Sequence, residues 1–443
     1  MESVLTRKTI ATYAIGSVGT GGFGTLPGLV LLAYMTDTLG IAAAAAGALI
    51  TVAKVWDVII DPVIGARSDR SLAVRGSRRP AMILGALALP VFFVLTFAVP
   101  AGIGPVASGV WVLLAFLITA TAFSLFQVPY IALPAELTGE YHARTKLISA
   151  RVVVLTLAIL LFGAGAPEIK NAFTDAYTGY LVMAIVAGLV IGAGLFISSF
   201  VAKRRELSAV EPVSILDNYR AGFAALRRSK PFRALLATFL LQGLATGIML
   251  AGAVYLAKWV IGADGVTFIF VSLVAPAILF APVWAIISRR IGKERTFVIA
   301  SVLFGVAALS MVALVWLPGQ WVYGPIALAG IGYAGMQSLP LSMLPDVISH
   351  DADRHGTGAA GSFGGVWTAG ETTGIALGTT VLGIVLGASG YIESVGGVAV
   401  TQPASAIMGI ALSFSAVPAL IILLSLITFS RYPLRKADID AVR

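Results

Sequence analysis

Three ionisable side chains interrupt an apolar run at Lys54-Val55-Trp56-Asp57-Val58-Ile59-Ile60-Asp61-Pro62. On a helix, positions i, i+3 and i+7 fall within an arc of about 60°, so Lys54, Asp57 and Asp61 share one face. A charged group at the centre of a bilayer costs roughly 2.5–3.5 kcal/mol on insertion scales, so such groups face a protein interior or a wet cavity. Two carboxylates and one ammonium beside the helix-breaking Pro62 therefore indicate a cation site. The alternative is a buried ion pair that only joins two helices, which would leave one aspartate without a positive partner.

The composition is that of an integral membrane protein. Of the 443 residues, 58% are hydrophobic and only 12% are charged, whereas soluble domains average about 25% charged residues. The 48 glycines fit transmembrane helices that pack closely through small residues. The absence of cysteine excludes disulfides, thiol catalysis and cysteine-ligated metals. The three histidines, His142, His350 and His355, fall in predicted loops, so proton chemistry inside the membrane is left to carboxylates.

Twelve apolar runs are long enough to span a bilayer as helices. The longest polar stretch, 202–232, separates six runs from six, which predicts an N-terminal half at 1–201, a C-terminal half at 233–430 and a tail at 431–443. Apolar residues recur with helical spacing among the arginines of 208–230, which predicts an amphipathic helix lying on the cytoplasmic leaflet. The runs lie at about 10–36, 40–66, 80–100, 108–134, 146–165, 178–201, 233–261, 266–288, 297–317, 322–345, 358–388 and 404–430.

The distribution of lysine and arginine predicts that both termini are cytoplasmic. With the N-terminus inside, 26 of the 30 basic residues fall in cytoplasmic segments. Only Lys170 and Lys258 fall on the opposite side, while Lys54 and Arg151 lie within spans. Membrane topology thus explains the net charge of +9, and we expect no nucleic-acid partner.

A weak internal repeat predicts two related six-helix halves. Short basic segments follow the second span, at 65–80, and the eighth span, at 288–295. Two such halves with binding near the midplane are the architecture of a major facilitator transporter, an all-α membrane fold. The first segment either is a generic topogenic cluster or latches the cytoplasmic ends of neighbouring helices during gating. Its gating candidates are Asp69, Arg70, Arg78 and Arg79.

Several motifs together resemble the glycoside–pentoside–hexuronide:cation symporter family, the melibiose-permease-like branch of the major facilitator superfamily. The most specific is WDVIIDP at 56–62, which resembles that family's W-D-x-x-x-D-P cation motif. The motifs occur in both halves, so the resemblance covers nearly the whole chain. The others are YMTDTLG at 34–40, VPY at 128–130 followed by EYHART at 140–145 and Arg151, LPDV at 344–347, and the run 358–371.

The resemblance implies that Asp57 and Asp61 bind the coupling cation, with Ser124 on the fourth span as a neutral ligand. The chemistry of the residues agrees with this. A hard cation such as Na⁺ wants several oxygens, which two carboxylates and a hydroxyl supply, whereas H⁺ needs only one carboxylate. Lys54 would hold an aspartate ionised and release it when the cation arrives. We expect no cofactor and no metal beyond Na⁺; the coupling ion, Na⁺ or H⁺, stays open.

The sequence also departs from the family. Sugar-transporting members carry acidic residues on the first and fourth spans, and the matching positions here are Gly21 and Gln127. The lysine of the eleventh span is replaced by Thr372, next to Glu371. Loss of both acids argues against a galactoside, because carboxylate–diol contacts select sugars strongly. Gln127 can still donate and accept hydrogen bonds.

Few polar side chains remain to line a substrate cavity. Arg151 either binds an anionic or hydroxylated group of the substrate or pairs with Asp57 or another acid. Trp367 and Glu371 share a helix face, which suits a sugar ring, although a tryptophan packed between helices is as common. The substrate candidates are Lys54, Gln127, Tyr130, Arg151, Gln337, Trp367 and Glu371.

These observations predict a secondary transporter that couples a cation to the symport of a small polar solute, such as a sugar or glycoside, by alternating access. A lipid or lysolipid carrier of the same family is the first alternative, and a non-transporting membrane scaffold is the second. The sequence has no nucleophile–base constellation, phosphate loop or Walker motif, which argues against an enzyme or a primary pump. We expect a monomer that crosses a bacterial inner membrane several times and has a small-molecule substrate.

Overall fold

The computed structural model describes residues 6–138, 141–202, 224, 226–263, 265–355, 360–398 and 400–434. These residues form helices, joined by turns and one isolated β-bridge between Leu39 and Val395. The chain divides into two compact units: Met1–Ile215 with Glu393–Val400, and Leu216–Ile392 with Thr401–Arg443. The boundary falls in the long polar stretch of the sequence.

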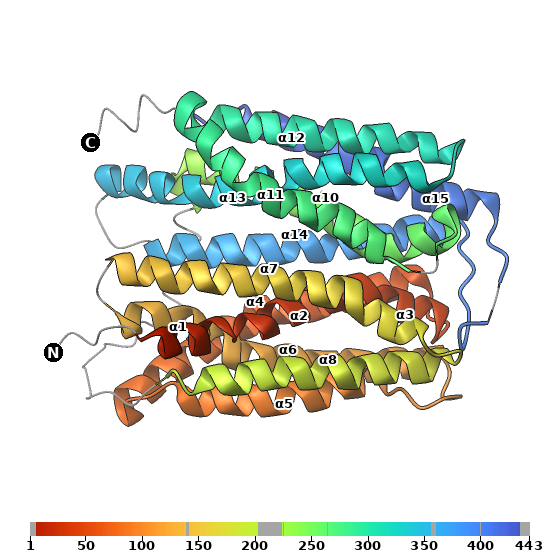
Figure 1. The fold of residues 1–443 in the computed structure, drawn as a ribbon, viewed down its shortest axis with the longest axis horizontal. Helices are drawn as coiled ribbons and strands as arrows, with labels where there is room; N and C mark the ends of the chain where they lie inside the picture. Colours follow the sequence, from red (N-terminus) through yellow and green to blue (C-terminus); the bar gives the residue numbers. More distant parts are fainter. Residues whose placement is uncertain are drawn as a thin grey trace. The chain divides into compact units, whose positions relative to one another are not determined.

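In its described part, unit 1 is a bundle of six long helical segments that run side by side (Figure 1). The first segment is interrupted by a π-helical turn, η1, directly after α2. Within the bundle α2 packs against α7, α4 against α6, and α5 against both α6 and α8. The elements are α1 (Arg7–Ala14), α2 (Ser17–Leu26), η1 (Pro27–Leu31), α3 (Leu32–Asp37), α4 (Ala43–Arg75), α5 (Arg79–Phe97), α6 (Pro105–Leu137), α7 (Tyr141–Asn171) and α8 (Ala176–Ser199).

Unit 2 is also built from long helices. In it α10 packs against α14 and α16, and α13 packs against α11 and α12. Its elements are α10 (Lys230–Tyr255), η2 (Leu256–Ile261), α11 (Thr267–Ile291), α12 (Lys293–Ser310), η3 (Met311–Val315), η4 (Gln320–Val322), α13 (Tyr323–His355), α14 (Ala360–Ala388), α15 (Ala404–Phe414) and α16 (Ala416–Phe429).

Eleven helices among the described residues are long and apolar enough to cross a membrane. The one expected span without a match, the tenth at 322–345, corresponds to α13, which is a continuous helix but is not among the eleven found in the described residues. Two prolines and polar residues such as Gln337 interrupt its apolar sequence. The expectations of twelve spans and of cytoplasmic termini therefore stay predictions.

Several helices extend past the apolar runs from which they were predicted. The second span was expected to end near residue 66, but α4 continues to Arg75, so residues 65–75 are helical and not a loop. Hydropathy detects only the part of a helix that lies in lipid, whereas charged residues continue the same helix into water. The helix ends where Gly76 takes a φ of +69°, a left-handed conformation that favours glycine. Gly292 ends α11 in unit 2 with a φ of +93°.

Small residues set how closely α10 and α14 approach each other. A Cβ added at Gly378 of α14 would lie 2.6 Å from the backbone of α10, and one added at Gly247 of α10 would lie 2.3 Å from the carbonyl oxygen of Ile375. Side chains at these positions would force the helices apart, so the glycines allow the backbone contact typical of membrane helices.

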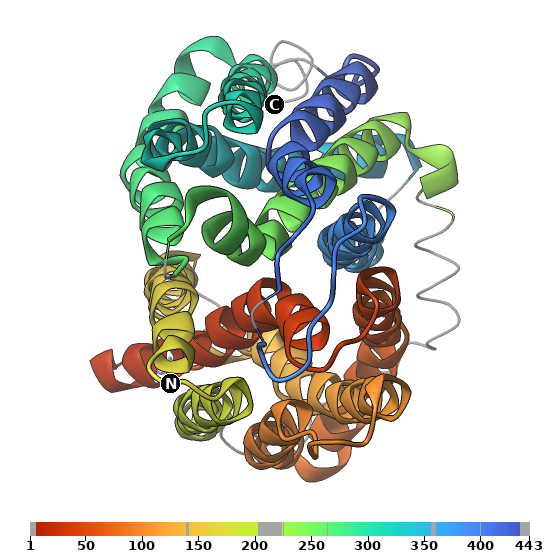
Figure 2. The same ribbon diagram turned by 90° about the vertical axis from the view of Figure 1, so that its right-hand side faces the viewer.

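The segment Glu393–Val400 belongs to unit 1 by its contacts, although the chain reaches it from α14. The Ser394 and Gly396 amides donate to the carbonyl oxygens of Thr36 and Thr38, at 3.0 and 2.8 Å. The Glu393 carboxylate accepts a bond from the Ala43 amide at 2.9 Å, at the start of α4, where Ala42 offers no capping side chain. Figure 2 shows this segment, in blue, at the red ends of the first two spans.

The expected amphipathic helix at 208–230 lies largely outside the described residues, which resume continuously only at 226.

Candidate functional site

The ionisable cluster of the sequence lies in the middle of α4, which continues through Pro62. The Lys54 ammonium is 3.1 Å from Asp57 Oδ2. The two side chains keep only 23% and 12% of their surface exposed, so this ion pair is screened much less than one at a surface. Lys54 thus compensates one of the two acids that share its helix face.

Asp61 and Ser124 come together as the resemblance implied. The Ser124 hydroxyl, on α6 and buried, is close enough to hydrogen-bond the Asp61 carboxylate. Oδ1 of Asp57 and Oδ1 of Asp61 are buried and have no hydrogen-bond partner among the described residues. A buried acceptor without a donor is costly, and a hard cation satisfies such oxygens. The two carboxylates and the hydroxyl are therefore oxygen ligands that fit a monovalent cation, and either carboxylate could take up a proton.

Aromatic rings surround the Lys54 ammonium. Its nitrogen lies 5.4 Å from the ring centroid of Phe23 on α2 and 5.9 Å from that of Phe116 on α6. Both distances are within cation–π range. These rings were not predicted from the sequence, because nothing in the local spacing shows that residues 31 and 62 positions away face Lys54. Together the two rings stabilise a positive charge next to the two acids.

Arg151 lies in a second cluster of unit 1, apart from Asp57, whose partner is Lys54. Its guanidinium carbon is 5.3 Å from the Tyr130 ring, and its Nε is buried with no hydrogen-bond partner in the described structure. Tyr130 stacks on Tyr13 at a centroid distance of 4.7 Å. Arg151 thus keeps hydrogen-bonding capacity at Nε, and Tyr13 is a neighbour that was not predicted from the sequence.

Tyr130 itself is enclosed by the first span. Its side chain is 0% exposed. Its hydroxyl donates to the Tyr13 carbonyl oxygen at 2.9 Å and lies 3.0 Å from the Ser17 hydroxyl. These bonds occupy the hydroxyl of Tyr130, which therefore points to the first span. The face of its ring is the surface that Arg151 contacts.

The positions where sugar-transporting members carry acids are filled differently here. A Cβ added at Gly21 would lie 2.7 Å from Ala158 Cβ and 3.0 Å from the Leu155 carbonyl oxygen, so α7 leaves no room for a side chain. Gln127 accepts a hydrogen bond from the Thr20 hydroxyl at 2.8 Å. At Gly21, the packing of α2 against α7 thus excludes an acidic side chain.

The unit 2 candidates lie on α13 and α14. Gln337 donates to the Tyr333 hydroxyl at 2.8 Å, and Tyr333 is close enough to Glu371 for an electrostatic interaction. No basic side chain in the described part of the chain pairs with Glu371. Trp367 stacks on Phe239 at 4.4 Å and is 2% exposed, which favours the packing interpretation of this ring.

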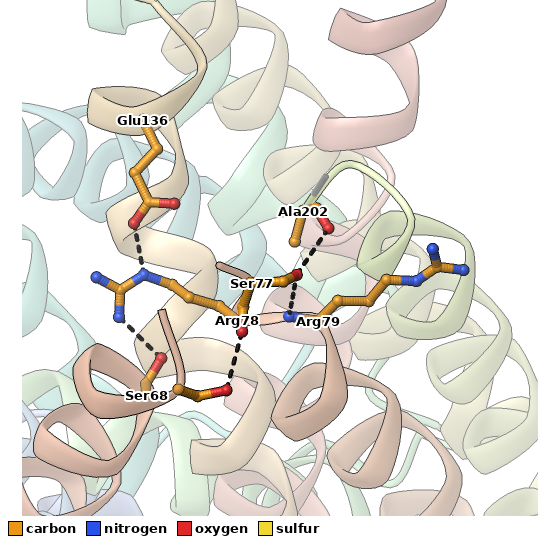
Figure 3. Close-up of polar contacts among 7 residues, drawn as sticks. Ser68, Ser77, Arg78, Arg79, Glu136 and Ala202 are labelled. Atoms are coloured by element: carbon orange, nitrogen blue, oxygen red, sulfur yellow. Dashed lines mark hydrogen bonds and ion pairs between the residues drawn. The ribbon is translucent and has the colours of Figure 1, made fainter. Parts of the chain in front are cut away.

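The four gating candidates do not form one cluster, and only Arg78 is seen in an ion pair among the described contacts. Arg78 pairs with Glu136 on α6, with 2.5 Å between Nε and Oε1, and donates to Ser68 at 2.8 Å (Figure 3). Arg79 points away from both partners, and Arg70 is exposed. Asp69 is helical, but its side chain lies outside the description.

Unit 2 has an ion pair that corresponds to the Arg78–Glu136 pair of unit 1. Lys293, the first residue of α12, pairs with Asp346 on α13, just as Arg78 before α5 pairs with Glu136 on α6. In each unit, a basic residue at the start of the third long helix therefore meets an acid near the end of the fourth.

The sequence model of one protein family, described as "MFS/sugar transport protein", matches residues 12–436. The chain belongs to this family. The resemblance to glycoside–pentoside–hexuronide:cation symporters is thereby confirmed, and the protein is a multi-pass membrane transporter of the major facilitator class, not an enzyme.

Two curated relatives and one solved structure illustrate the likeness. The "Glucuronide carrier protein homolog" of Escherichia coli (strain K12) is 26% identical, with 98% of this chain and 94% of the relative covered. The "Sodium-dependent lysophosphatidylcholine symporter 1" of Gallus gallus is also 26% identical, with 95% and 85% covered. The nucleoside transporter NupG superposes with a TM-score of 0.67 at 14% identity, over 96% of this chain and 99% of its own, and thus shows the fold alone.

Proposed function

We propose that the protein is a cation-coupled symporter of a small sugar-like solute and that Asp57 and Asp61 bind the coupling cation. The observation that carries this proposal is the pair of buried carboxylate oxygens that lack donors, one on each aspartate, with the Ser124 hydroxyl beside them. A structural ion pair needs one acid for one lysine. The second acid and the two unsatisfied oxygens remain to be explained, and a cation explains both.

Lys54 supplies a means of coupling. While the cation is absent, its ammonium holds Asp57 ionised at 3.1 Å, and the rings of Phe23 and Phe116 stabilise the charge. A cation that arrives between the carboxylates repels the ammonium and weakens the Lys54–Asp57 bond. Lys54 is then free to turn toward a solute, so that occupation of one site changes the other. The two halves alternate their access by moving relative to each other.

The solute-binding side chains proposed in unit 1 are Lys54, Gln127 and Arg151, and in unit 2 Gln337 and Glu371. A partly buried guanidinium, of which Nε has no hydrogen-bond partner in the described structure, favours an anionic or polyhydroxylated solute. A hexuronide carries both kinds of group, and the E. coli relative is named as a glucuronide carrier homologue. We propose that the protein works as a monomer in a bacterial inner membrane.

The test is uptake of methyl glucuronide into proteoliposomes driven by a Na⁺ gradient or by a proton gradient, measured separately. Asp57→Asn is expected to abolish gradient-driven uptake because an amide cannot neutralise a cation. Asp175→Asn, which changes an exposed acid at the start of α8, is the matched control and is expected to transport normally. Unchanged uptake by Asp57→Asn would show that the cation assignment is wrong.

A lysolipid carrier is the second candidate. The lysophosphatidylcholine symporter has the same identity to this chain, 26%, as the glucuronide carrier homologue, and α7 excludes an acid at Gly21. The same proteoliposomes offered lysophosphatidylcholine decide between the two. Na⁺-dependent flipping without glucuronide uptake would replace the sugar assignment and keep the cation site.

A further inference from the structure

A hollow lies at the end of unit 1 where α4 ends and α5 begins. It has a volume of about 650 Å³ and is lined by two arginines, Arg75 and Arg79, and by the apolar side chains of Val74, Pro80 and Ile83. The described residues that line it include no acid. A concave surface with this lining suits a ligand that joins an anionic group to an apolar one.

Two successive arginines at the start of α5 have opposite surroundings (Figure 3). Arg78 is buried and its guanidinium binds Glu136 and Ser68. Arg79 extends the other way, and its Nε is buried without a hydrogen-bond partner in the described structure. Arg78 therefore stabilises the contact between helices, whereas Arg79 pairs with no acid among the residues that the structure describes.

The Arg79 guanidinium is held in place by packing. Its central carbon lies 4.1 Å from the ring centroid of Phe200, at the end of α8. The adjacent Ser77 hydroxyl accepts from the Arg79 amide at 3.2 Å and donates to the Ala202 carbonyl oxygen at 3.2 Å, which joins α5 to the end of α8. A guanidinium fixed on an aromatic face still presents its donors in the plane of the fork, so it can bind a phosphate bidentately.

The hollow borders the surface that the bundle exposes to lipid. Leu84 and Leu87, about one and two turns beyond Pro80 on α5, keep 59% and 57% of their surface exposed, and Phe200 keeps 43%. Large apolar side chains exposed in a row on a membrane-spanning helix face acyl chains. A ligand whose anionic group reaches Arg79 thus has its remaining length beside lipid-facing side chains.

We propose that this hollow binds the head group of an anionic phospholipid, with the phosphate between Arg79 and Arg75 and the acyl chains along Ile83 and Leu87. The lipid comes from the leaflet on the basic side of the protein, which the distribution of lysine and arginine predicts to be cytoplasmic. The site lies apart from Asp57 and Asp61 and is independent of the proposed transport reaction.

Unit 2 provides an internal comparison. Lys293 repeats the inward pairing of Arg78, but the next residue, the counterpart of Arg79, is Glu294. An acid at this place repels phosphate. The proposed lipid site therefore belongs to unit 1, and the start of α12 offers a control for general attraction between basic residues and anionic lipid.

The experiment is native mass spectrometry of the purified full-length protein in detergent, titrated with phosphatidylglycerol or phosphatidylcholine. Arg79→Gln is expected to weaken phosphatidylglycerol binding by about tenfold or more, as loss of a charge-assisted bond implies. Arg295→Gln removes an exposed charge at the start of α12 and is expected to change binding by less than about twofold. Phe200→Ala keeps both arginines but frees the Arg79 fork, and should weaken binding by an intermediate factor.

The following results would each overturn the proposal. Equal losses in Arg79→Gln and Arg295→Gln would mean general charge attraction, and no loss in Arg79→Gln would mean that the lipid binds elsewhere. Equal binding of both lipids by the wild-type protein would remove the selection for a net negative head group. Displacement of phosphatidylglycerol by millimolar inorganic phosphate would identify a soluble phosphate site instead. If Arg79→Gln unfolds in detergent, Phe200→Ala gives the same decision.

Discussion

Replacing Lys54 by methionine should destabilise the protein in the absence of coupling cation and strengthen cation binding. At an effective dielectric constant of about 20, unit charges 3.1 Å apart attract by about 5 kcal/mol. Desolvation offsets part of this, and breaking a buried pair from one side costs about 3–5 kcal/mol. Because Lys54 keeps 23% of its side chain exposed, we expect about 3 kcal/mol, at the lower end of that range.

The assay is thermal unfolding of the purified protein over a range of Na⁺ concentrations. Wild-type protein should gain little stability from Na⁺, because the ammonium competes for Asp57. Lys54→Met should start lower and gain more, because ligand binding to the native state raises apparent stability. Lys54→Arg is the control that keeps the charge and should resemble the wild type.

The double variant Lys54→Met/Asp57→Asn decides whether the ion pair is the cause. Removing both charges leaves no uncompensated group, so this variant should recover most of the stability that Lys54→Met loses. If it is no more stable than Lys54→Met, the loss comes from packing against Phe23 and Phe116, and the electrostatic reasoning fails.

Three further predictions concern the scaffold. Gly378→Ala should destabilise unit 2 by about 1–3 kcal/mol, because its methyl group meets the α10 backbone, whereas Gly243→Ala, with 3.5 Å of space at the same interface, should be neutral or stabilising in thermal unfolding. Arg78→Gln should lower the unfolding midpoint by leaving Glu136 unpaired, and adding Glu136→Gln should restore most of it; a double variant as unstable as the single one would contradict this. Glu393→Ala should cost about 1 kcal/mol by removing the distant cap of α4, and an unchanged midpoint would show that the cap contributes nothing.

Much of the candidate site was readable from the helical period. The spacing of Lys54, Asp57 and Asp61 places them on one face of any helix, and in the structure Lys54 and Asp57 pair on that face. The proximity of Ser124 to Asp61 came from the family resemblance, because the distance between α4 and α6 leaves no trace in local spacing. Phe23 and Tyr13, on the first span, were not predicted for the same reason.

The sequence by itself determined the membrane class, the long polar stretch in which the boundary of the two units falls, and the acids of the second span, because hydropathy and helical periodicity are properties of neighbouring residues. Tertiary structure alone decided which of the paired arginines faces inward, that α7 closes the space at Gly21, and that Glu393 caps a helix 350 residues earlier. These outcomes depend on which helices meet and at what distance, and contacts between distant segments are set by the packing of the whole bundle.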